Sequence, residues 1–452
     1  MSVQNWQNVG RPRIYVDLYT YLNAIGQIKQ TLFQAQYLNG FGDQIPPNEG
    51  SSDTYPIISG DRTDQFQHPF GLDPWKHRIA PFTAGGATRC SYEYDFDQTP
   101  VSSSSEWIGT SNQDLVISPN KLSDYVDYVG ILGNNLGGGN ITGFNGGHFT
   151  MRPGFKYAYA ETDNTSWIGY GRMLANASGF EDIHGSQNEH ATVCDVSAKY
   201  GFGWNMFKIN SFASNTYNWD GSQSWPHGFA VQLDVPRDEE SNQVGDFQPS
   251  HYNVCSLTAG KVYDFPVSPS MKLRMTRDFD GIDTQTTRGG STLTNIRYTG
   301  SPDWGNGKPP WMNYAGSLGA GAIRRVGRRS WSLSFEQVAD DDLMAAYESL
   351  TSKPYGHADW GVAMTEDPYT TDPDGSIRYA RQMARPILED QSFYSQILMK
   401  TLGGSLPFIF QPDRTNASPD QFAICRIKRN SFRFSQKSHH RYNFKLDIVE
   451  TW

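Results

Sequence analysis

The stretch Ser330-Trp331-Ser332-Leu333-Ser334-Phe335 decides the fold class, because it alternates a large apolar side chain with serine over six residues. Successive side chains of a strand point to opposite faces, so the pattern predicts an antiparallel strand with one face in a core. Asp340-Asp341-Asp342 follows and precedes the apolar stretch 343–350. Acids in a first turn complement the helix dipole, which favours a helix at this point.

The segment downstream of this strand predicts a second helix and a pair of buried strands. The helix is expected from about Glu389 to Lys400, with Gly403-Gly404 as its C-cap. Residues 407–410 and 422–427 are apolar and aromatic and are predicted as strands. The intervening segment 411–420 is rich in Pro, Asp and Asn, which is typical of a turn.

The last strand completes the predicted C-terminal unit. It carries four large apolar residues on one face, Tyr442, Phe444, Leu446 and Ile448. Many short strands with frequent turns favour a β-sandwich, here with flanking helices. No repeat of fixed period is visible, which disfavours a propeller or a β-helix.

Strand signals also occur at the other end and in the middle of the chain. Residues 13–18 (Arg-Ile-Tyr-Val-Asp-Leu) predict a strand, and helical spacing of apolar residues predicts a helix over 19–39, although Gly26 weakens it. Residues 228–236 and 271–275 are further predicted strands. The region 41–130 is rich in loop residues.

Composition narrows the class of protein. Charged residues make up only 19 % of the chain, aromatic residues 13 %, and there are 44 glycines, which favours strands and turns over amphipathic helices. A net charge of −9 disfavours a general nucleic-acid binder. Residues 1–320 carry ten more acidic than basic side chains, whereas residues 321–452 carry one more basic than acidic side chain. This difference supports a domain boundary near residue 320.

Cysteine usage and hydropathy give no sign of a cofactor site or a membrane anchor. The four cysteines are far apart and form no CxxC pair, so reduced thiols are expected. The first ten residues are polar and no apolar run approaches the roughly 20 residues of a membrane span. We expect no cofactor, and a chain that is made in the cytoplasm.

Several segments together resemble virion structural proteins of tailed bacteriophages, many of them from marine and cyanobacterial hosts. The similar segments are 13–17 (RIYVD), 279–282 (FDGI), 287–292 (TRGGST), 302–305 (PDWG), 327–335 (GRRSWSLSF), 393–413 (from FYS through TLGGSLPFIFQPD) and 421–426 (QFAICR). The resemblance covers about residues 1–40 and 275–452. The order of strand, helix, strand pair and strand is also similar to the tail-tube fold, which distal-tail proteins share and into which they commonly insert a second domain.

The resemblance implies a domain plan and a role. Residues 1–44 and 271–452 would form a tail-tube-like β-sandwich, and residues 45–270 an inserted, loop-rich β domain. The chain would be a non-enzymatic structural subunit that forms a homo-oligomeric ring at the tail tip or baseplate. Its partners would be further copies of itself and other tail or receptor-binding proteins.

Four arginines are the candidate contacts between subunits in such a ring. Arg324, Arg325, Arg328 and Arg329 lie just before the strand at 330–335. Contact with DNA passing through a tail is conceivable, but an inter-subunit salt-bridge face is favoured because the chain is acidic. The sequence predicts no sequence-specific recognition of nucleic acid.

The alternative function is recognition of a host-surface glycan. Trp167, Trp204, Trp219 and Trp225 have neighbouring Asn and Asp residues, and aromatic faces stack on sugar rings while amides bond hydroxyls. The competing interpretation places these tryptophans in a core or a subunit contact. A tail glycan depolymerase is a third candidate, disfavoured because it usually needs a β-helix repeat.

Metal and catalytic motifs are incomplete. Residues 278–283 (DFDGID) resemble the start of an EF-hand loop, but position 289 is Gly where the bidentate Glu would stand, so a turn is expected. His184, Glu189, His190, Cys194 and Asp195 do not have HExxH spacing, and His439-His440 is expected at a solvated strand face or hairpin end. The Gly-rich segment 133–147 lacks the Gly-Lys-Ser/Thr of a P-loop, and no GxSxG elbow occurs.

Overall fold

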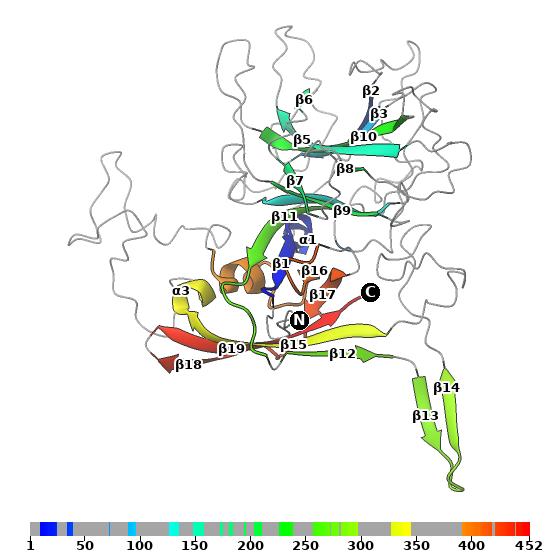
Figure 1. Ribbon diagram of the computed structural model, residues 1–452, viewed down its shortest axis with the longest axis vertical. Helices are drawn as coiled ribbons and strands as arrows, with labels where there is room; N and C mark the ends of the chain where they lie inside the picture. The colour runs from blue at the N-terminus through cyan, green and yellow to red at the C-terminus, as the bar shows by residue number, and fades with distance from the viewer. Residues whose placement is uncertain are drawn as a thin grey trace, which may run out of the picture.

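The structure is a computed structural model, and its main feature is antiparallel β structure with a few short helices (Figure 1). It describes residues 10–24, 34–38, 72, 89–95, 126–134, 148–157, 172–174, 180–183, 194–195, 203–209, 226–237, 256–271, 273–279, 282–296, 327–344, 391–417, 421–438 and 440–452. The predicted β-rich fold class with few helices is therefore confirmed.

The larger sheet has eleven strands. In the order in which they lie side by side, its strands are β12 (Arg274–Asp278), β15 (Arg328–Ala339), β19 (Arg441–Glu450), β17 (Ala423–Ile427), β16 (Phe408–Gln411), β1 (Arg13–Asp17), β11 (Ser256–Asp264), β4 (Tyr128–Asn134), β9 (Gly203–Ile209) and β7 (Phe180–Asp182). The eleventh strand, β18 (Arg433–Ser438), pairs with β19 beside β17.

Two smaller sheets and three short helices complete the described structure. The six-stranded sheet contains β2 (Gln34–Leu38), β3 (Arg89–Asp95), β10 (Pro226–Arg237), β5 (His148–Tyr157) and β6 (Arg172–Leu174), with β8 (Cys194–Asp195) paired to β5. The two-stranded sheet is the hairpin of β13 (Ile282–Thr286) and β14 (Thr292–Ile296). The helices are α1 (Leu18–Ala24), α3 (Asp340–Leu343) and the π-helix η9 (Tyr394–Met399).

The central strands of the large sheet are buried on both faces. In β1, Ile14 and Val16 belong to one hydrophobic core and Tyr15, between them, belongs to the other. β16 repeats the pattern, with Phe408 and Phe410 on the first core and Ile409 on the second. A strand covered on both faces needs a continuous apolar run, which is what these two segments provide.

The large sheet curls around the first core, because strands far apart in its order meet face to face. The ring of Phe265, just after β11, stacks on Phe335 of β15 with centroids 4.7 Å apart. Trp331 of β15 packs edge-on against Phe410 of β16 at 5.1 Å. Helix η9 contacts β1 and β11, and α3 contacts β15 and β19. A β-sandwich-like layer with flanking helices results.

A buried carboxylate fixes the junction between β1 and α1. Asp17 Oδ2 accepts hydrogen bonds from the Thr20 amide (2.7 Å) and hydroxyl (2.6 Å), as a helix N-cap does. Asp17 Oδ1 accepts hydrogen bonds from the Thr258 hydroxyl and the Ala259 amide of β11. Burial raises the pKa of Asp17, while these hydrogen bonds oppose the rise. The cap therefore also joins two strands.

The predicted C-terminal elements are largely confirmed. β15 alternates buried and half-buried residues, and Tyr442, Phe444, Leu446 and Ile448 of β19 are all buried. The predicted helix at 389–400 is described as a π-helix over 394–399 with Lys400 as its C-cap, so the predicted C-cap at Gly403-Gly404 is displaced. These two glycines have positive φ angles in the turn that follows, where the Gly403 amide donates to the Leu398 carbonyl at 2.6 Å. α3 contains Asp340, so the three acids form the helix rather than precede it.

The predicted helix over 19–39 is wrong in its second half. The helix is described only to Ala24, and residues 34–38 form strand β2, paired with β3 from Gln34↔Glu93 through Leu38↔Arg89. The partner lies more than 50 residues away in the sequence, so tertiary pairing overrides the local apolar spacing. The strand predicted at 271–275 is β12, displaced to 274–278, and the strand at 228–236 is confirmed within β10.

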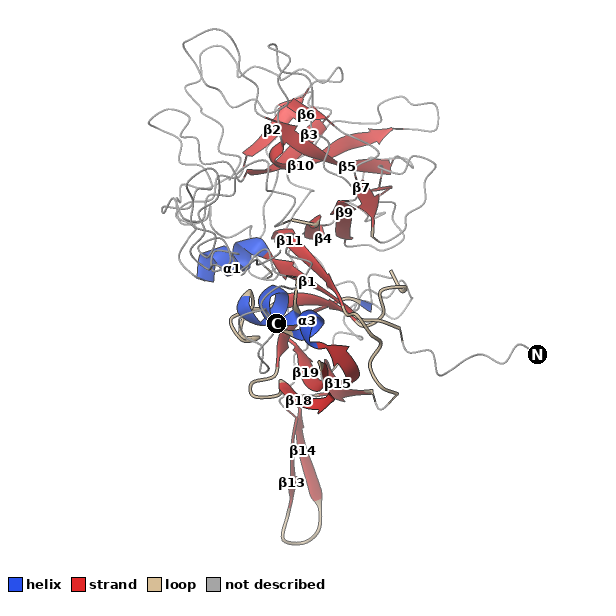
Figure 2. Cartoon of the chain, turned by 90° about the vertical axis from the view of Figure 1, so that its left-hand side faces the viewer, coloured by secondary structure: helices blue, strands red, loops and turns tan. Residues whose placement is uncertain are grey.

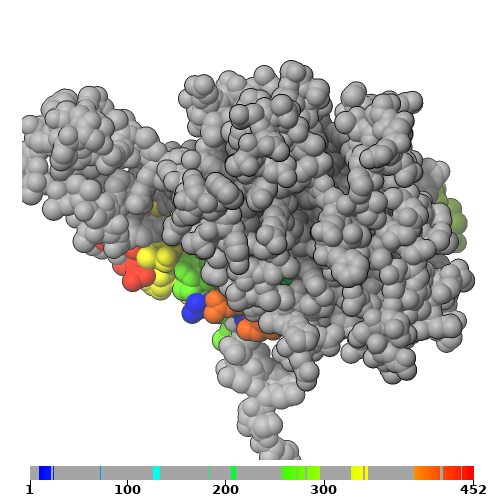
Figure 3. All heavy atoms as spheres, turned by 90° about the horizontal axis from the view of Figure 1, so that it is seen from above, coloured from blue at the N-terminus to red at the C-terminus, as the bar shows by residue number. Residues whose placement is uncertain are grey.

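The described strands of the predicted inserted segment 45–270 are divided between two sheets. β4, β7, β9 and β11 come from the predicted inserted segment 45–270, yet they belong to the same sheet as β1. The six-stranded sheet is drawn from residues 34–237 and shares no strand with the large sheet. The first described residues lie against the C-terminal third, because the Arg414 amide donates to the Arg11 carbonyl at 2.8 Å, and Figure 3 shows blue and orange atoms side by side.

Candidate assembly surface

The β13–β14 hairpin projects from the body of the molecule, pointing away from the six-stranded sheet (Figure 1, Figure 2). Every described side chain from Ile282 to Asn295 is exposed. The two strands join through a five-residue turn in which the Thr287 amide donates to the Ser291 carbonyl (2.8 Å) and Gly290 has φ +84°. The hairpin is an arm that no other described part of the chain covers.

The arm carries residues that favour strand pairing, but its two strands are paired only with each other among the described strands. Register places Thr284 opposite Thr294 and Thr286 opposite Thr292, and β-branched pairs of this kind favour a hairpin. An isolated two-stranded hairpin is nevertheless marginally stable in water. Because Leu293 is 59 % exposed, the arm also presents apolar surface that a partner would cover.

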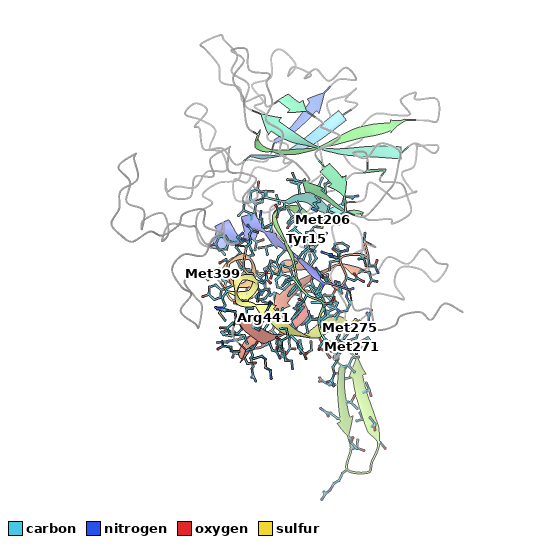
Figure 4. All side chains as sticks on the ribbon, turned by 60° about the vertical axis from the view of Figure 1, so that its left-hand side comes forward. Tyr15, Met206, Met271, Met275, Met399 and Arg441 are labelled. Atoms are coloured by element: carbon cyan, nitrogen blue, oxygen red, sulfur yellow. The ribbon has the colours of Figure 1, made fainter. Side chains whose placement is uncertain are left out.

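A second exposed apolar group lies at the base of the arm. Met271, Leu273, Met275 and Phe279 are 69, 41, 52 and 47 % exposed. Met271 and Met275 lie together close to the point where the arm leaves the body (Figure 4). Of the eight large apolar residues exposed in the described part of the chain, six fall between residues 271 and 293, so the exposure is concentrated.

This apolar group continues the core-facing side of the large sheet. Met275 of β12 lies opposite Trp331 of β15 in the antiparallel register, and opposed residues share a face. Trp331 is buried at 4 % exposure, whereas Met275 is half exposed, so the apolar face extends past the edge of the core. We call Met271, Leu273, Met275, Phe279 and the β13–β14 arm the assembly surface.

β12 also ends the large sheet, so one backbone edge faces outward. It pairs with β15 on one side and has no partner on the other among the described strands. An unpaired edge offers amide and carbonyl groups to an added strand. Arg274, Arg277 and Asp278 stand on this five-residue strand, and charges on an edge discourage indiscriminate pairing.

The predicted arginine interface is divided by the structure. Arg324 and Arg325 lie outside the described residues. Arg328 is half-buried, and its guanidinium lies over the ring of Trp452 at 4.8 Å from the centroid. Arg329 is 6 % exposed. The structure therefore brings together only Arg328 and Arg329, and they have different surroundings.

Arg329 is engaged within its own chain. Its guanidinium donates to Glu450 at 2.9 Å and to the Phe422 carbonyl at 2.8 Å, and its backbone amide also donates to Glu450 at 2.8 Å. Trp331 covers the guanidinium at 5.4 Å. The contacts join β15, β19 and the start of β17, which is a structural role. The inter-subunit role predicted for this group stays a prediction.

Most of the predicted glycan-binding and metal-binding residues lie outside the part of the chain that the structure describes. Trp204 lies in β9 opposite Leu132 of β4, and only its backbone is described. The other three tryptophans, Trp167, Trp219 and Trp225, and the residues His184, Glu189 and His190 lie outside the described residues. Within the described part, no three His, Cys, Asp or Glu side chains are grouped as metal ligands.

The hairpin was missed from the sequence, although a signal for it exists. Two runs rich in Thr and Ile, 282–286 and 292–296, flank a turn that contains Gly289-Gly290, which is the pattern of a β-hairpin. The exposure of the arm could not be predicted, because the local sequence does not indicate whether further strands pair with the hairpin.

Comparison with known proteins gives no relative: no family model, curated protein or solved structure matches the chain. Among the helices of the described residues, none is long and apolar enough to cross a membrane. The function must therefore be argued from the geometry of the chain itself.

Proposed function

We propose that the chain is a structural subunit of a phage tail that assembles with further copies of itself into a ring at the tail tip or baseplate. The observation that carries the proposal is the assembly surface, which combines an uncovered hairpin arm, an open sheet edge and a concentrated apolar group. The resemblance of residues 1–40 and 275–452 to virion structural proteins supports the same role.

The physics of the surface fits a contact with a neighbouring subunit. Edge-to-edge continuation of a sheet supplies main-chain hydrogen bonds, and an arm that is marginal alone gains order when a neighbour covers it. Complete burial of a methionine or leucine side chain contributes about 1.5–3 kcal/mol, so the half-exposed Leu273 and Met275 would each contribute roughly 1 kcal/mol.

A head-to-tail ring requires that this surface meet a different surface on the next copy. Such heterologous contacts close into a ring when the rotation between neighbours divides a full turn. A two-fold contact would instead place the arm against itself. The number and arrangement of subunits in assembled particles therefore distinguish the proposed ring from a simple dimer.

The test is the oligomeric state of the full chain, by mass photometry and negative-stain microscopy. We expect closed rings from the natural chain. Replacement of residues 282–296 by a short Gly-Ser linker, or Met275→Lys with Leu273→Lys, should leave monomers. Leu402→Lys is the matched control, since Leu402 is also an exposed leucine, at 45 %, but follows η9 in the chain and is not one of the residues of the assembly surface.

Two results would contradict the proposal. Rings that form equally well without the arm would show that the assembly surface is not the contact. A chain that is monomeric alone, and that is not found in any tail tip by microscopy of intact particles, would remove the structural role.

A further inference from the structure

A separate feature of the chain is a basic run on the outer face of the large sheet. Residues 426–445 contain seven Lys and Arg residues and no Asp or Glu, in a chain whose net charge is −9. The seven are Arg426, Lys428, Arg429, Arg433, Lys437, Arg441 and Lys445, and all of them are exposed. The assembly surface does not include them.

Strand register gathers four of these cations, Arg426, Arg433, Arg441 and Lys445, on one side of the sheet. Lys445 of β19 lies between Arg433 of β18 and Ser334 of β15. The neighbouring residue Phe444 points into the core, so Lys445 points the opposite way. In the next strand, Arg426 of β17 is the one exposed residue among buried neighbours. Arg441 stands four residues before Lys445 on β19 and so points to the same side, and Figure 4 shows it on the body and not on the arm.

The rest of this face carries small polar side chains. Ser330, Ser332 and Ser334 of β15 are half-buried and alternate with the buried residues of that strand. Asn443 and Ser435 oppose one another on β19 and β18. The same strands carry the acids Glu336, Asp447 and Glu450, which are fewer than the cations, and Glu450 is buried against Arg329. We call this side of β15, β17, β18 and β19 the basic face.

The charge on the basic face is not neutralised within the described chain. Arg433 and Lys445 are directly opposed, and like charges in that position destabilise a strand pair. Among the described residues, no carboxylate forms an ion pair with any of the seven cations. An external anion placed between such cations would relieve the repulsion and gain charge-assisted hydrogen bonds.

The composition of the face decides between kinds of polyanion. Cores of protein–protein interfaces are enriched in aromatic residues and Arg and depleted in Lys and Ser; the basic face shares the Arg but has Lys and Ser in place of the aromatic residues. Interfaces with nucleic acid are polar and strongly positive, and Arg, Lys, Ser and Asn are the side chains that contact phosphate and sugar. The small serines leave the cations standing above a shallow sheet, where an extended backbone could lie.

We propose that the basic face binds the sugar–phosphate backbone of DNA without reading its sequence. The inference is independent of the assembly surface and of the ring. It is consistent with a net acidic chain, because the attraction is local to one face. Neutralising Z phosphates of duplex DNA gives a salt slope of about −0.9Z, so four contacts predict a slope of roughly −4 in log affinity against log salt.

The test is fluorescence anisotropy with the full chain and labelled 30-nucleotide DNA of mixed sequence, as duplex and as single strand, between 50 and 200 mM NaCl. Arg433→Ser with Lys445→Ser should weaken binding at least tenfold and reduce the slope by about 2, because two phosphate contacts are lost. The matched control is Arg11→Ser with Arg414→Ser, which removes two exposed cations outside the basic face. Circular dichroism verifies that both variants are folded.

Each outcome has a definite meaning. Binding to either form of DNA that falls with salt, and that only the Arg433/Lys445 variant loses, supports the proposal, and the stronger form identifies duplex or single strand as the ligand. No binding at 50 mM NaCl, or equal binding by both variants, overturns it. If polyglutamate of matched charge competes as well as unlabelled DNA, the face is an acidic-protein site and the DNA proposal fails.

Discussion

The buried pair of Arg329 and Glu450 gives a prediction whose size follows from the structure. The two side chains are 7 % and 1 % exposed and are joined at 2.9 Å, so neither charge has water to replace its partner. Breaking a buried pair from one side costs about 3–5 kcal/mol, because the remaining charge is left uncompensated. Glu450→Ala should therefore lower the free energy of unfolding by roughly 4 kcal/mol, since the Arg329 amide also loses its acceptor.

Removing both charges provides the contrast. Arg329→Met combined with Glu450→Leu fills a similar volume with apolar atoms, and such replacements are often neutral or stabilising. We expect the double variant to be at least 2 kcal/mol more stable than Glu450→Ala, by urea unfolding followed by circular dichroism. Hydrogen exchange of peptides from β15 and β19 would locate the effect at the pair.

The same experiment tests the role that the sequence suggested for Arg329. A change of less than about 1 kcal/mol in the unfolding free energy of Glu450→Ala would refute the buried-pair reasoning. If Glu450→Ala instead abolished ring assembly without changing the unfolding free energy, the result would support the predicted inter-subunit role of Arg329.

Three further predictions concern the core. Gly260→Ala should cost about 3 kcal/mol or more, because a Cβ would lie 1.9 Å from the Val16 carbonyl oxygen, whereas Gly289→Ala meets open space and should be near neutral by the same unfolding assay. Phe335→Ala should cost about 3–5 kcal/mol, since the ring is fully buried, and a loss under 1 kcal/mol would mean the core is not packed as described. Burial raises the pKa of Cys425, so its thiol should resist alkylation at pH 8 until the chain unfolds, which peptide mass spectrometry would report. Because the pKa is higher in the folded than in the unfolded chain, the thiol contributes stability that is fully present below pH about 8.5 and declines above it by up to about 1.4 kcal/mol per pH unit. Cys425→Ala should remove this pH dependence of the unfolding free energy.

The parts of the fold that the sequence predicted are those whose pattern is local. The alternation at Trp331, Leu333 and Phe335 reflects one buried face, and the left-handed residues Gly403 and Gly404 mark the turn that follows the helix without reference to distant partners. The helix predicted over 19–39 was wrong where residues 34–38 found a distant strand.

The candidate surfaces depend on information that no local pattern holds. Met275 shares a face with Trp331 in β15, yet one is half exposed and the other buried, because β12 is the last strand of the sheet. Arg329 follows Arg328 directly, but successive side chains of a strand point to opposite faces, and Arg329 therefore meets Glu450, 121 residues away in the sequence. The cations of β17, β18 and β19 become one face only when the strands pair.

The pairing of β1 with β16 has a consequence for the synthesis of the chain. Tyr15 donates a hydrogen bond to Gln411 at 2.8 Å, a contact between residues 396 positions apart. At about 5–20 residues per second, β1 waits roughly 20–80 s on the ribosome before its neighbour exists. During that interval the apolar run of β1 has half of its sheet missing, which makes nascent chains clients for chaperones. A fragment cut short before β16 cannot close the core, so translation must pass residue 411 before the chain can reach its folded state.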